Sequence, residues 1–284
     1  MHKTAERVAG GLAIVACSIV LTSCDEGVLS PKGPIGQAEK TILFDATAIM
    51  LAVVLPVIVL TLAFAWWYRA GNQRARYLPD WEYSGRIEMI VWSIPTLIIL
   101  FLGGMAWISA HDLDPPTPIQ SRNEPLEIEV VSMDWKWVFI YPDQKIATVN
   151  ELVVPVATPL HFRLTSSSVM NSFFVPQLGS QIYTMPGMVT QLMLQADERG
   201  TYAGRSVQFS GDGFSDMKFD VHAVSDAEFQ HWIEVTKQNG TGLDANGYLG
   251  LLKPSHADTP RTFSSVDSKL FDHAVMTTMH AEDH

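Results

Sequence analysis

The side chains best suited to metal binding or nucleophilic attack are few in this chain, and their positions suit neither task. Both cysteines, Cys17 and Cys24, lie in the first 24 residues, so the remainder has no thiolate for a metal, a disulfide or nucleophilic catalysis. The nine histidines are scattered, and His161 and His222 fall on predicted strands rather than at a metal-ligand spacing. No Ser/His/Asp set, phosphate-binding loop or dinucleotide fingerprint occurs in a supporting context. The sequence therefore predicts no catalytic residue and no metal site in this chain.

The net charge and the mean hydropathy of the chain limit the class of protein to which it can belong. The 284 residues include 19 Lys and Arg against 30 Asp and Glu, which gives a net charge of -11. An acidic chain without a basic cluster is a poor ligand for nucleic acid, so we exclude that class of function. The mean hydropathy is nevertheless positive, which indicates that apolar residues are concentrated in particular segments.

The first 24 residues have the pattern of an export signal. Basic residues precede an apolar run over residues 8–21, which is shorter than a comfortable membrane span. The run ends in Leu21-Thr-Ser-Cys24, which resembles a bacterial lipoprotein cleavage box. This resemblance implies that a signal peptide of residues 1–23 is removed, that Cys24 receives a lipid, and that Asp25 favours retention in the inner membrane. The alternative is an ordinary first transmembrane helix with an incidental cysteine.

Two longer apolar segments, residues 46–68 and 87–110, are each long enough to cross ~30 Å of hydrocarbon. The short arginine-rich loop between them belongs in the cytoplasm by the positive-inside rule. An exported segment of residues 24–45 and everything after residue 110 then lie outside, in the bacterial periplasm. Residues 111–125 are rich in proline and are predicted as a stiff linker that leaves the membrane.

Residues 126–225 contain short apolar strands separated by turn residues, a pattern typical of an all-β sandwich or Greek-key barrel. The strand candidates begin at Leu126, Trp135, Glu151, Leu160, Val189 and Lys218. Residues 226–284 are predicted as a C-terminal extension, with a short helix over 226–237, Ser225 as its N-cap, and an irregular course after it.

A two-helix transmembrane hairpin followed by an exported β-domain resembles subunit II of haem-copper terminal oxidases, over nearly the whole mature chain. The most specific segments are residues 130–137, 165–176, 177–183 and 203–218. The resemblance implies that residues 126–225 form a cupredoxin domain, with the short helical and irregular tail behind it.

In the cytochrome c oxidase branch of this family, the cupredoxin domain holds a binuclear copper centre, and the resemblance shows where its ligands would fall. The bridging cysteines are replaced by serines, the histidines by asparagine and phenylalanine, and the carbonyl-donating glutamate by glutamine. Only the methionine keeps its type, and a thioether alone is a weak ligand, so we interpret it as a core residue. The lost copper-ligand positions are Asn171, Ser206, Gln208, Ser210, Phe214 and Met217.

This pattern of losses resembles the quinol oxidase branch, the cytochrome bo-type enzymes. The resemblance implies a complex that oxidises ubiquinol, reduces dioxygen to water and pumps protons. Haems and copper would then lie in subunit I, so this chain would need no cofactor of its own and no cytochrome c. Its partners would be subunit I, the other subunits and membrane lipid, with ubiquinol bound by the complex.

Two other readings of the same residues predict different partners. A copper-bearing cytochrome c oxidase subunit would be an electron carrier, and Ser206 and Ser210 argue directly against it. A stand-alone inner-membrane lipoprotein would use a metal-free cupredoxin-like domain as a binding module, and co-purification with a haem-bearing partner would exclude it.

Three further residues are candidates for roles within such a complex. Glu88 begins the second span, where an ionisable group is a functional candidate. The family resemblance implies a place at the mouth of a proton channel of subunit I, with Glu82 as the less favoured substitute and a solvated carboxylate as the alternative. Trp135 and Trp137 fall near the electron-entry path of the copper branch, and without copper they are predicted to pack and to dock against subunit I.

Overall fold

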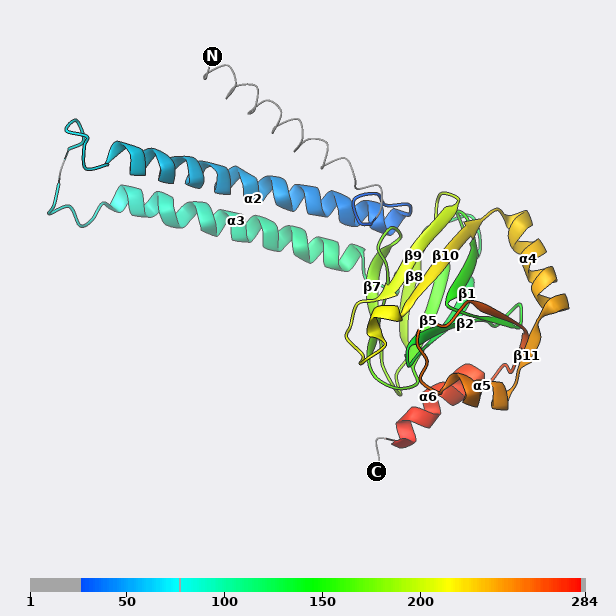
Figure 1. The fold of residues 1–284 in the computed structure, drawn as a ribbon. Coiled ribbons are helices and arrows are strands. Elements are labelled where there is room, and N and C mark those ends of the chain that lie inside the picture. The colour runs from blue at the N-terminus through cyan, green and yellow to red at the C-terminus, as the bar shows by residue number, and fades with distance from the viewer. Residues whose placement is uncertain (1–26, 77, 282–284) are drawn as a thin grey trace, which may run out of the picture. The chain divides into compact units, whose positions relative to one another are not determined.

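The structure, a computed structural model, describes residues 27–76 and 78–281 (Figure 1). Cys24, the predicted site of lipid attachment, lies outside the described residues. The described chain forms two compact units, one of which is Lys40–Asp114 and the other the remainder.

Two long helices supply the apolar segments of the chain. Helix α2 spans Pro34–Trp67 and helix α3 spans Gly85–Asp112, and each is long and apolar enough to cross a membrane. Their apolar side chains are largely exposed within this chain, as expected of helices that face lipid or another subunit. Helix α2 covers the predicted span at residues 46–68 except for its last residue, and α3 contains the predicted span at residues 87–110.

Helix α2 begins twelve residues before the apolar segment that the sequence marks as a span. Pro34 suits the first helical position because it has no N–H to leave unpaired. The preceding chain also packs against the β-domain, where the Lys32 N–H donates to the Gln177 carbonyl at 2.6 Å. Gly36 then donates to the Leu178 carbonyl at 3.0 Å. The helix start is thus fixed by proline and by these contacts, not by hydrophobicity.

The rest of the chain is a two-sheet β-sandwich, which confirms the predicted fold class. One sheet has the strand order β11-β12-β3-β2-β1-β5-β8, and the other has the order β4-β10-β9-β6-β7 (Figure 1). The strands are β1 Leu126–Met133, β2 Lys136–Tyr141, β3 Ile146–Val149, β4 Glu151–Pro155, β5 Leu160–Ser166, β6 Asn171–Val175, β7 Gly179–Thr184, β8 Thr190–Leu194, β9 Gly200–Ser206, β10 Lys218–Val224, β11 Thr241–Leu243 and β12 Arg261–Val266.

Pairing in both sheets mixes parallel and antiparallel neighbours, as long crossover connections require. Strand β1 runs antiparallel to β2 and parallel to β5. Strand β10 runs parallel to β4 and antiparallel to β9. The five-stranded sheet thereby brings the start of β6 and the end of β9 to the same place, through the pair Phe173 and Ser206.

Strand β2 is buried on both of its faces. Its inward face carries Trp137, Phe139 and Tyr141, which belong to the inner core between the two sheets. Its outward face carries Val138 and Ile140, which belong to a second, outer core. Side chains alternate across a strand, so this near-continuous apolar run is explained only if something covers the outer face of the sheet.

The C-terminal extension supplies that cover. Helix α4 spans Asp226–Asn239, and the hydroxyl of Ser225 accepts from the Glu228 N–H in a capping box, which confirms the predicted N-cap. The sequence predicted an irregular course after this helix, but the chain forms β11, α5 (Ala245–Leu251), β12 and α6 (Leu270–Ala281). Strand β12 pairs with β3, so these elements extend the sheet and pack on its outer face.

Candidate functional site

The six lost copper-ligand positions gather at one end of the five-stranded sheet. Asn171 begins β6, Ser206 ends β9, and Met217 immediately precedes β10. Gln208 and Ser210 lie in the loop after β9, and this loop continues into a 3-10 helix, η1, at Phe214–Asp216. We call residues 206–217 the ligand loop. The fold therefore keeps the geometry that a metal between β6 and this loop would use.

The side chains at these positions bond to one another instead of offering metal ligands. The Ser206 hydroxyl lies 3.2 Å from both the Asn171 side-chain oxygen and the Gln208 carbonyl, to either of which it donates. The Ser210 hydroxyl is buried without a hydrogen-bond partner in the described structure. Hydroxyl and amide oxygens are poor copper ligands compared with thiolate and imidazole, so the residues present do not fit a copper centre.

Aromatic and sulfur-bearing positions of the set serve packing. The Phe214 ring lies 5.7 Å from the Phe209 ring, and Met217 is buried in the inner core as the sequence indicated. The histidines lie elsewhere: His161 pairs with Glu127 at 2.8 Å, and His222 lies 3.4 Å from a Glu151 oxygen. Among the residues that the structure describes, no three His, Cys, Asp or Glu side chains form a metal-binding group.

Trp135 immediately precedes β2 and Trp137 lies on it, and the two have different surroundings. The Trp135 indole N–H donates to the Ser210 carbonyl at 2.9 Å, and its ring packs against the ligand loop. A Cβ at Gly213 would lie only 2.4 Å from that ring, so glycine is required there. Trp137 is 0% exposed and packs edge-on against two phenylalanines of the inner core. Trp137 is therefore a core residue in this chain, and docking against subunit I stays a prediction, with Trp135 the more exposed of the two tryptophans.

Exposed apolar side chains flank the ligand loop. Val169 and Met170 lie in the loop before β6, and Val207 and Phe209 lie in the ligand loop, with Phe209 72% exposed. The ligand loop is joined to β6, because the Val207 N–H donates to the Ser172 carbonyl at 3.3 Å. We call these four apolar residues the loop patch. A group of exposed apolar side chains on a globular domain is typical of a protein interface.

Glu88 lies in the first turn of α3 and is exposed in this chain, as is Glu82 in the preceding loop. A carboxylate in the first turn interacts favourably with the positive end of the helix dipole. Both glutamates belong to the helical unit, whereas the lost ligand positions belong to the β-domain.

Lys136 is a buried charge that the sequence analysis did not single out. Its side chain is 2% exposed, and its ammonium donates to the carbonyls of Asp134, Leu251 and Lys253 at 3.2, 3.0 and 2.8 Å. Burial lowers its pKa, and the nearby carboxylate of Asp258 opposes that shift. The available signal was its position, because a lysine on the same strand face as Val138 and Ile140 interrupts an apolar row.

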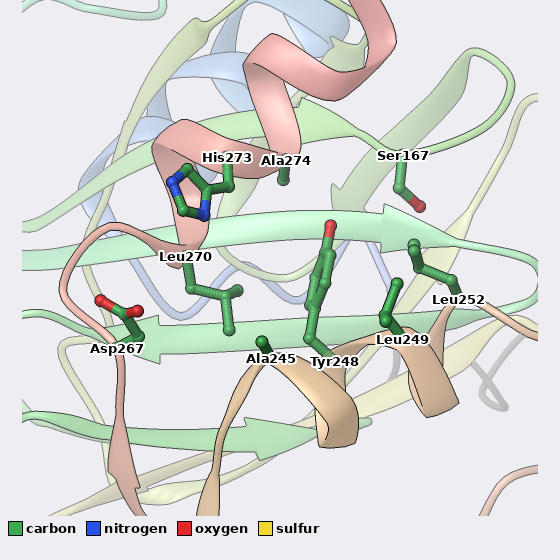
Figure 2. Close-up of a pocket in the computed structure, with 9 residues that line it drawn as sticks. All are labelled: Ser167, Ala245, Tyr248, Leu249, Leu252, Asp267, Leu270, His273 and Ala274. Atoms are coloured by element: carbon green, nitrogen blue, oxygen red, sulfur yellow. The ribbon is translucent and has the colours of Figure 1, made fainter.

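A cavity of about 270 Å³ lies where α5 and α6 meet the loop after β5, and Figure 2 shows its lining. Leu249 and Leu270 give it apolar walls, while Ser167 and Asp267 lie at its edge. Burial raises the pKa of Tyr248, which also lines it, to about 12, so this phenol stays neutral. None of the lost ligand positions lies in this cavity.

Two family models match this chain. Residues 142–224 match the periplasmic domain of cytochrome c oxidase subunit II, and residues 237–282 match the COX aromatic rich motif. The second match coincides with the extension that covers the outer face of the sheet.

Two relatives are similar to this chain over most of its length. The chain is 50% identical to cytochrome bo(3) ubiquinol oxidase subunit 2 of Pseudomonas aeruginosa, across 95% of this chain and 81% of that protein. It is 48% identical to ubiquinol oxidase subunit 2 of Acetobacter aceti, across 95% of this chain and 88% of that one. Among solved structures, the periplasmic domain of subunit II of cytochrome oxidase from Bradyrhizobium japonicum is 24% identical, with a TM-score of 0.40, across 43% of this chain and 98% of that one. By its extended similarity to the first two proteins, this chain belongs to the family of subunit 2 of the cytochrome bo(3) ubiquinol oxidases, a subunit of an oxidoreductase complex.

Proposed function

We propose that this chain is a non-redox subunit that anchors a periplasmic cupredoxin domain beside subunit I of a quinol oxidase. The complex would oxidise ubiquinol, reduce dioxygen to water and pump protons, with its haems and copper in subunit I. This chain would help to assemble and shape subunit I without passing electrons through its own domain.

The observation that carries this proposal is the bonding at the lost ligand positions. The Ser206 hydroxyl and the Asn171 amide satisfy each other where a metal would need free ligands. Without a metal, the domain has no relay for electrons from a soluble donor such as cytochrome c. A quinol dissolved in the bilayer needs no such relay, because it can reach a membrane subunit directly.

The loop patch and Trp135 support docking against another subunit. Phe209 and its apolar neighbours are exposed in this chain, whereas Asn171 and Ser206 are buried. An apolar surface next to a hydrogen-bonded loop suits contact with a permanent partner. We propose that this contact is made to subunit I, with lipid around the two apolar helices.

The test is metal analysis and activity on the detergent-purified complex, assayed with quinol and with reduced cytochrome c. The expected result is quinol oxidation, with haem and one copper per complex and no near-infrared band of a binuclear copper centre. Additional copper together with cytochrome c oxidation would contradict the proposal. Purification of the chain without any haem-bearing partner would instead favour the stand-alone lipoprotein with a cupredoxin-like binding module.

We further propose that Glu88 collects protons for subunit I. Its carboxylate is exposed at the start of an apolar helix, as a proton-entry group would need to be. Glu88→Gln should lower quinol oxidase turnover in the intact complex, and more strongly as the pH rises, because protons are then scarcer. Glu82→Gln is the matched control and should leave the pH profile unchanged. If the Glu88→Gln complex kept the wild-type pH profile, Glu88 would be a solvated carboxylate without a role in proton entry.

We also propose that Cys24 is the lipidated N-terminus of the mature chain, held in the inner membrane with both chain ends in the periplasm. Intact-mass analysis of the purified subunit should show loss of residues 1–23 and a mass increase from attached lipid. Cys24→Ser should abolish both, whereas Cys17→Ser should change neither. An unprocessed wild-type chain would favour the simple transmembrane helix.

A further inference from the structure

The segment between α5 and β12 crosses the domain surface next to the ligand loop. We call residues 251–258 the strap. Two of its carbonyls, those of Leu251 and Lys253, accept hydrogen bonds from the buried ammonium of Lys136. The Ser255 N–H donates to the Asp134 carbonyl at 3.0 Å, which adds a second attachment at the start of β2. The strap is therefore fixed to the strand that begins beside Trp135.

A further attachment fixes the far end of the strap. The Asn150 amide nitrogen donates to the Asp258 carbonyl at 2.9 Å, while its oxygen accepts from the Trp137 N–H at 2.8 Å. The Asp258 carboxylate also lies 3.8 Å from the Lys136 ammonium. A buried ammonium is tolerated when its protons are all bonded and a counter-charge is near, and Lys136 meets both conditions.

From this fixed position the strap reaches the ligand loop through one side chain. The His256 ring lies 4.9 Å from the Trp135 ring, with the two planes inclined at 34°. Its Nδ1 atom lies 3.6 Å from a carboxylate oxygen of Asp216, which belongs to η1 inside the ligand loop. Trp135 in turn donates to the Ser210 carbonyl, so it is held between the strap and the loop.

These contacts connect the buried Lys136, through the strap, to the ligand loop. No metal cross-links that loop. In the copper branch, ligands at the positions of Asn171 and the ligand loop would join β6 to that loop through the metal. Here the direct joins are two hydrogen bonds, from the Ser206 hydroxyl to the Asn171 oxygen and from the Val207 N–H to the Ser172 carbonyl, and the loop also contacts Trp135, which packs against His256.

We propose that the strap is a clamp that holds the ligand loop in place of the missing metal, with Lys136 as its anchor and His256 as its contact. This goes beyond the proposed function, because it assigns a task to the aromatic-rich extension whether or not the complex uses quinol. The clamp keeps Val207 and Phe209 of the loop patch in a fixed position for the partner subunit.

The test is hydrogen–deuterium exchange by mass spectrometry on the intact purified complex that carries His256→Ala. Amides of the ligand loop that bond within the domain, such as those of Val207, Asp216 and Met217, report its opening. Loss of the aromatic contact should speed their exchange about 2- to 10-fold. His231→Ala on the exposed side of α4 is the matched control and should leave this exchange unchanged. Unchanged loop exchange in His256→Ala overturns the proposal.

A second variant tests the anchor. Lys136→Met keeps an unbranched apolar side chain but removes the ammonium, so exchange should rise in the strap and in the ligand loop together. Lys237→Met on exposed α4 should affect neither. A strap that opens while the loop keeps its wild-type exchange would show that the two are not coupled and would overturn the clamp. If the complex with Lys136→Met does not assemble, hydrogen exchange in the His256→Ala complex decides the proposal by itself.

Discussion

Two neighbouring regions of the β-domain, the lost ligand positions and the aromatic core behind them, are held by different forces. The first is a small polar cluster in which Ser206 and Asn171 share one 3.2 Å hydrogen bond. The second is a set of rings in which Phe173 stacks on Phe219 at 5.1 Å and Trp137 meets Phe173 edge-on at 5.5 Å. They share strands, because Phe173 follows Asn171 by two residues on β6.

The difference shows that the aromatic core contributes more to the stability of the fold than the polar cluster does. Burying a large apolar side chain contributes about 1.5–3 kcal/mol, whereas a neutral hydrogen bond contributes about 1 kcal/mol net. Side chains that would hold copper could therefore be exchanged for serine and asparagine without loss of the sandwich. The aromatic rings next to them could not be exchanged so freely.

The largest effect is expected from breaking the aromatic core. Phe219→Ala should lower the free energy of unfolding by about 3–5 kcal/mol, because it leaves a cavity against Phe173 and Trp137. Thermal unfolding of the full chain in detergent measures this. Phe209→Ala, at an exposed ring, is the control and should change stability by no more than about 0.5 kcal/mol. Equal losses for the two variants would contradict the comparison.

A smaller effect is expected at the ligand positions. Ser206→Ala should cost about 1 kcal/mol, because the buried Asn171 oxygen loses its donor. Ser210→Ala should be neutral or stabilising, since the Ser210 hydroxyl is buried and makes no hydrogen bond within the described structure. Denaturant unfolding of both variants compares them directly. A larger loss for Ser210→Ala than for Ser206→Ala would mean that the polar cluster is held differently.

The smallest effect is expected at the capping box of α4, which lies outside both regions. The hydroxyl and the N–H of Ser225 donate to Glu228 and hold the pKa of its carboxyl below the usual 4.5, with a lesser contribution from Arg199. A lowered folded-state pKa means that the carboxylate stabilises the fold above the unfolded value, and that this stabilisation is lost as the pH falls through the folded value.

Glu228→Gln should therefore be slightly less stable than wild type near neutral pH, and the two should converge in acid below pH 4.5. Thermal unfolding across a pH series measures the difference. Glu234→Gln, at an exposed glutamate on the same helix, should show no such convergence. If the difference in stability between Glu228→Gln and wild type were the same at all pH values, the charge of the carboxylate could not be its cause.

Where local pattern and tertiary environment agree, the sequence predicts the structure well. Strand β10 and the Ser225 cap follow from alternation and from capping chemistry, respectively. Strand β9 does not, because Gly200–Ser206 has little apolar alternation and is a strand through its pairing with β10 and β6. The same holds for β12, whose partner β3 lies more than a hundred residues earlier.

At the candidate site, the sequence shows which residue types are present, but it does not show what surrounds each side chain in the fold. Serines at positions 206 and 210, where the family resemblance implies bridging cysteines, predict from residue type alone that no binuclear copper centre forms. Alternation alone could not tell that Trp137 is enclosed while Trp135 borders the ligand loop, because that depends on which sheet covers each side. Lys136 was missed for the same reason, since its acceptors lie on a segment far along the chain.

The outer face of the larger sheet has a consequence for how the molecule is made. Val131, Val138 and Ile140 are sealed only by the extension, through residues such as Leu251 and Phe271. The extension follows the rest of the sheet in the chain, so a nascent chain that has not yet reached it would present an uncovered β-surface of the kind that aggregates. Folding of this face therefore waits for residues made after the sandwich itself.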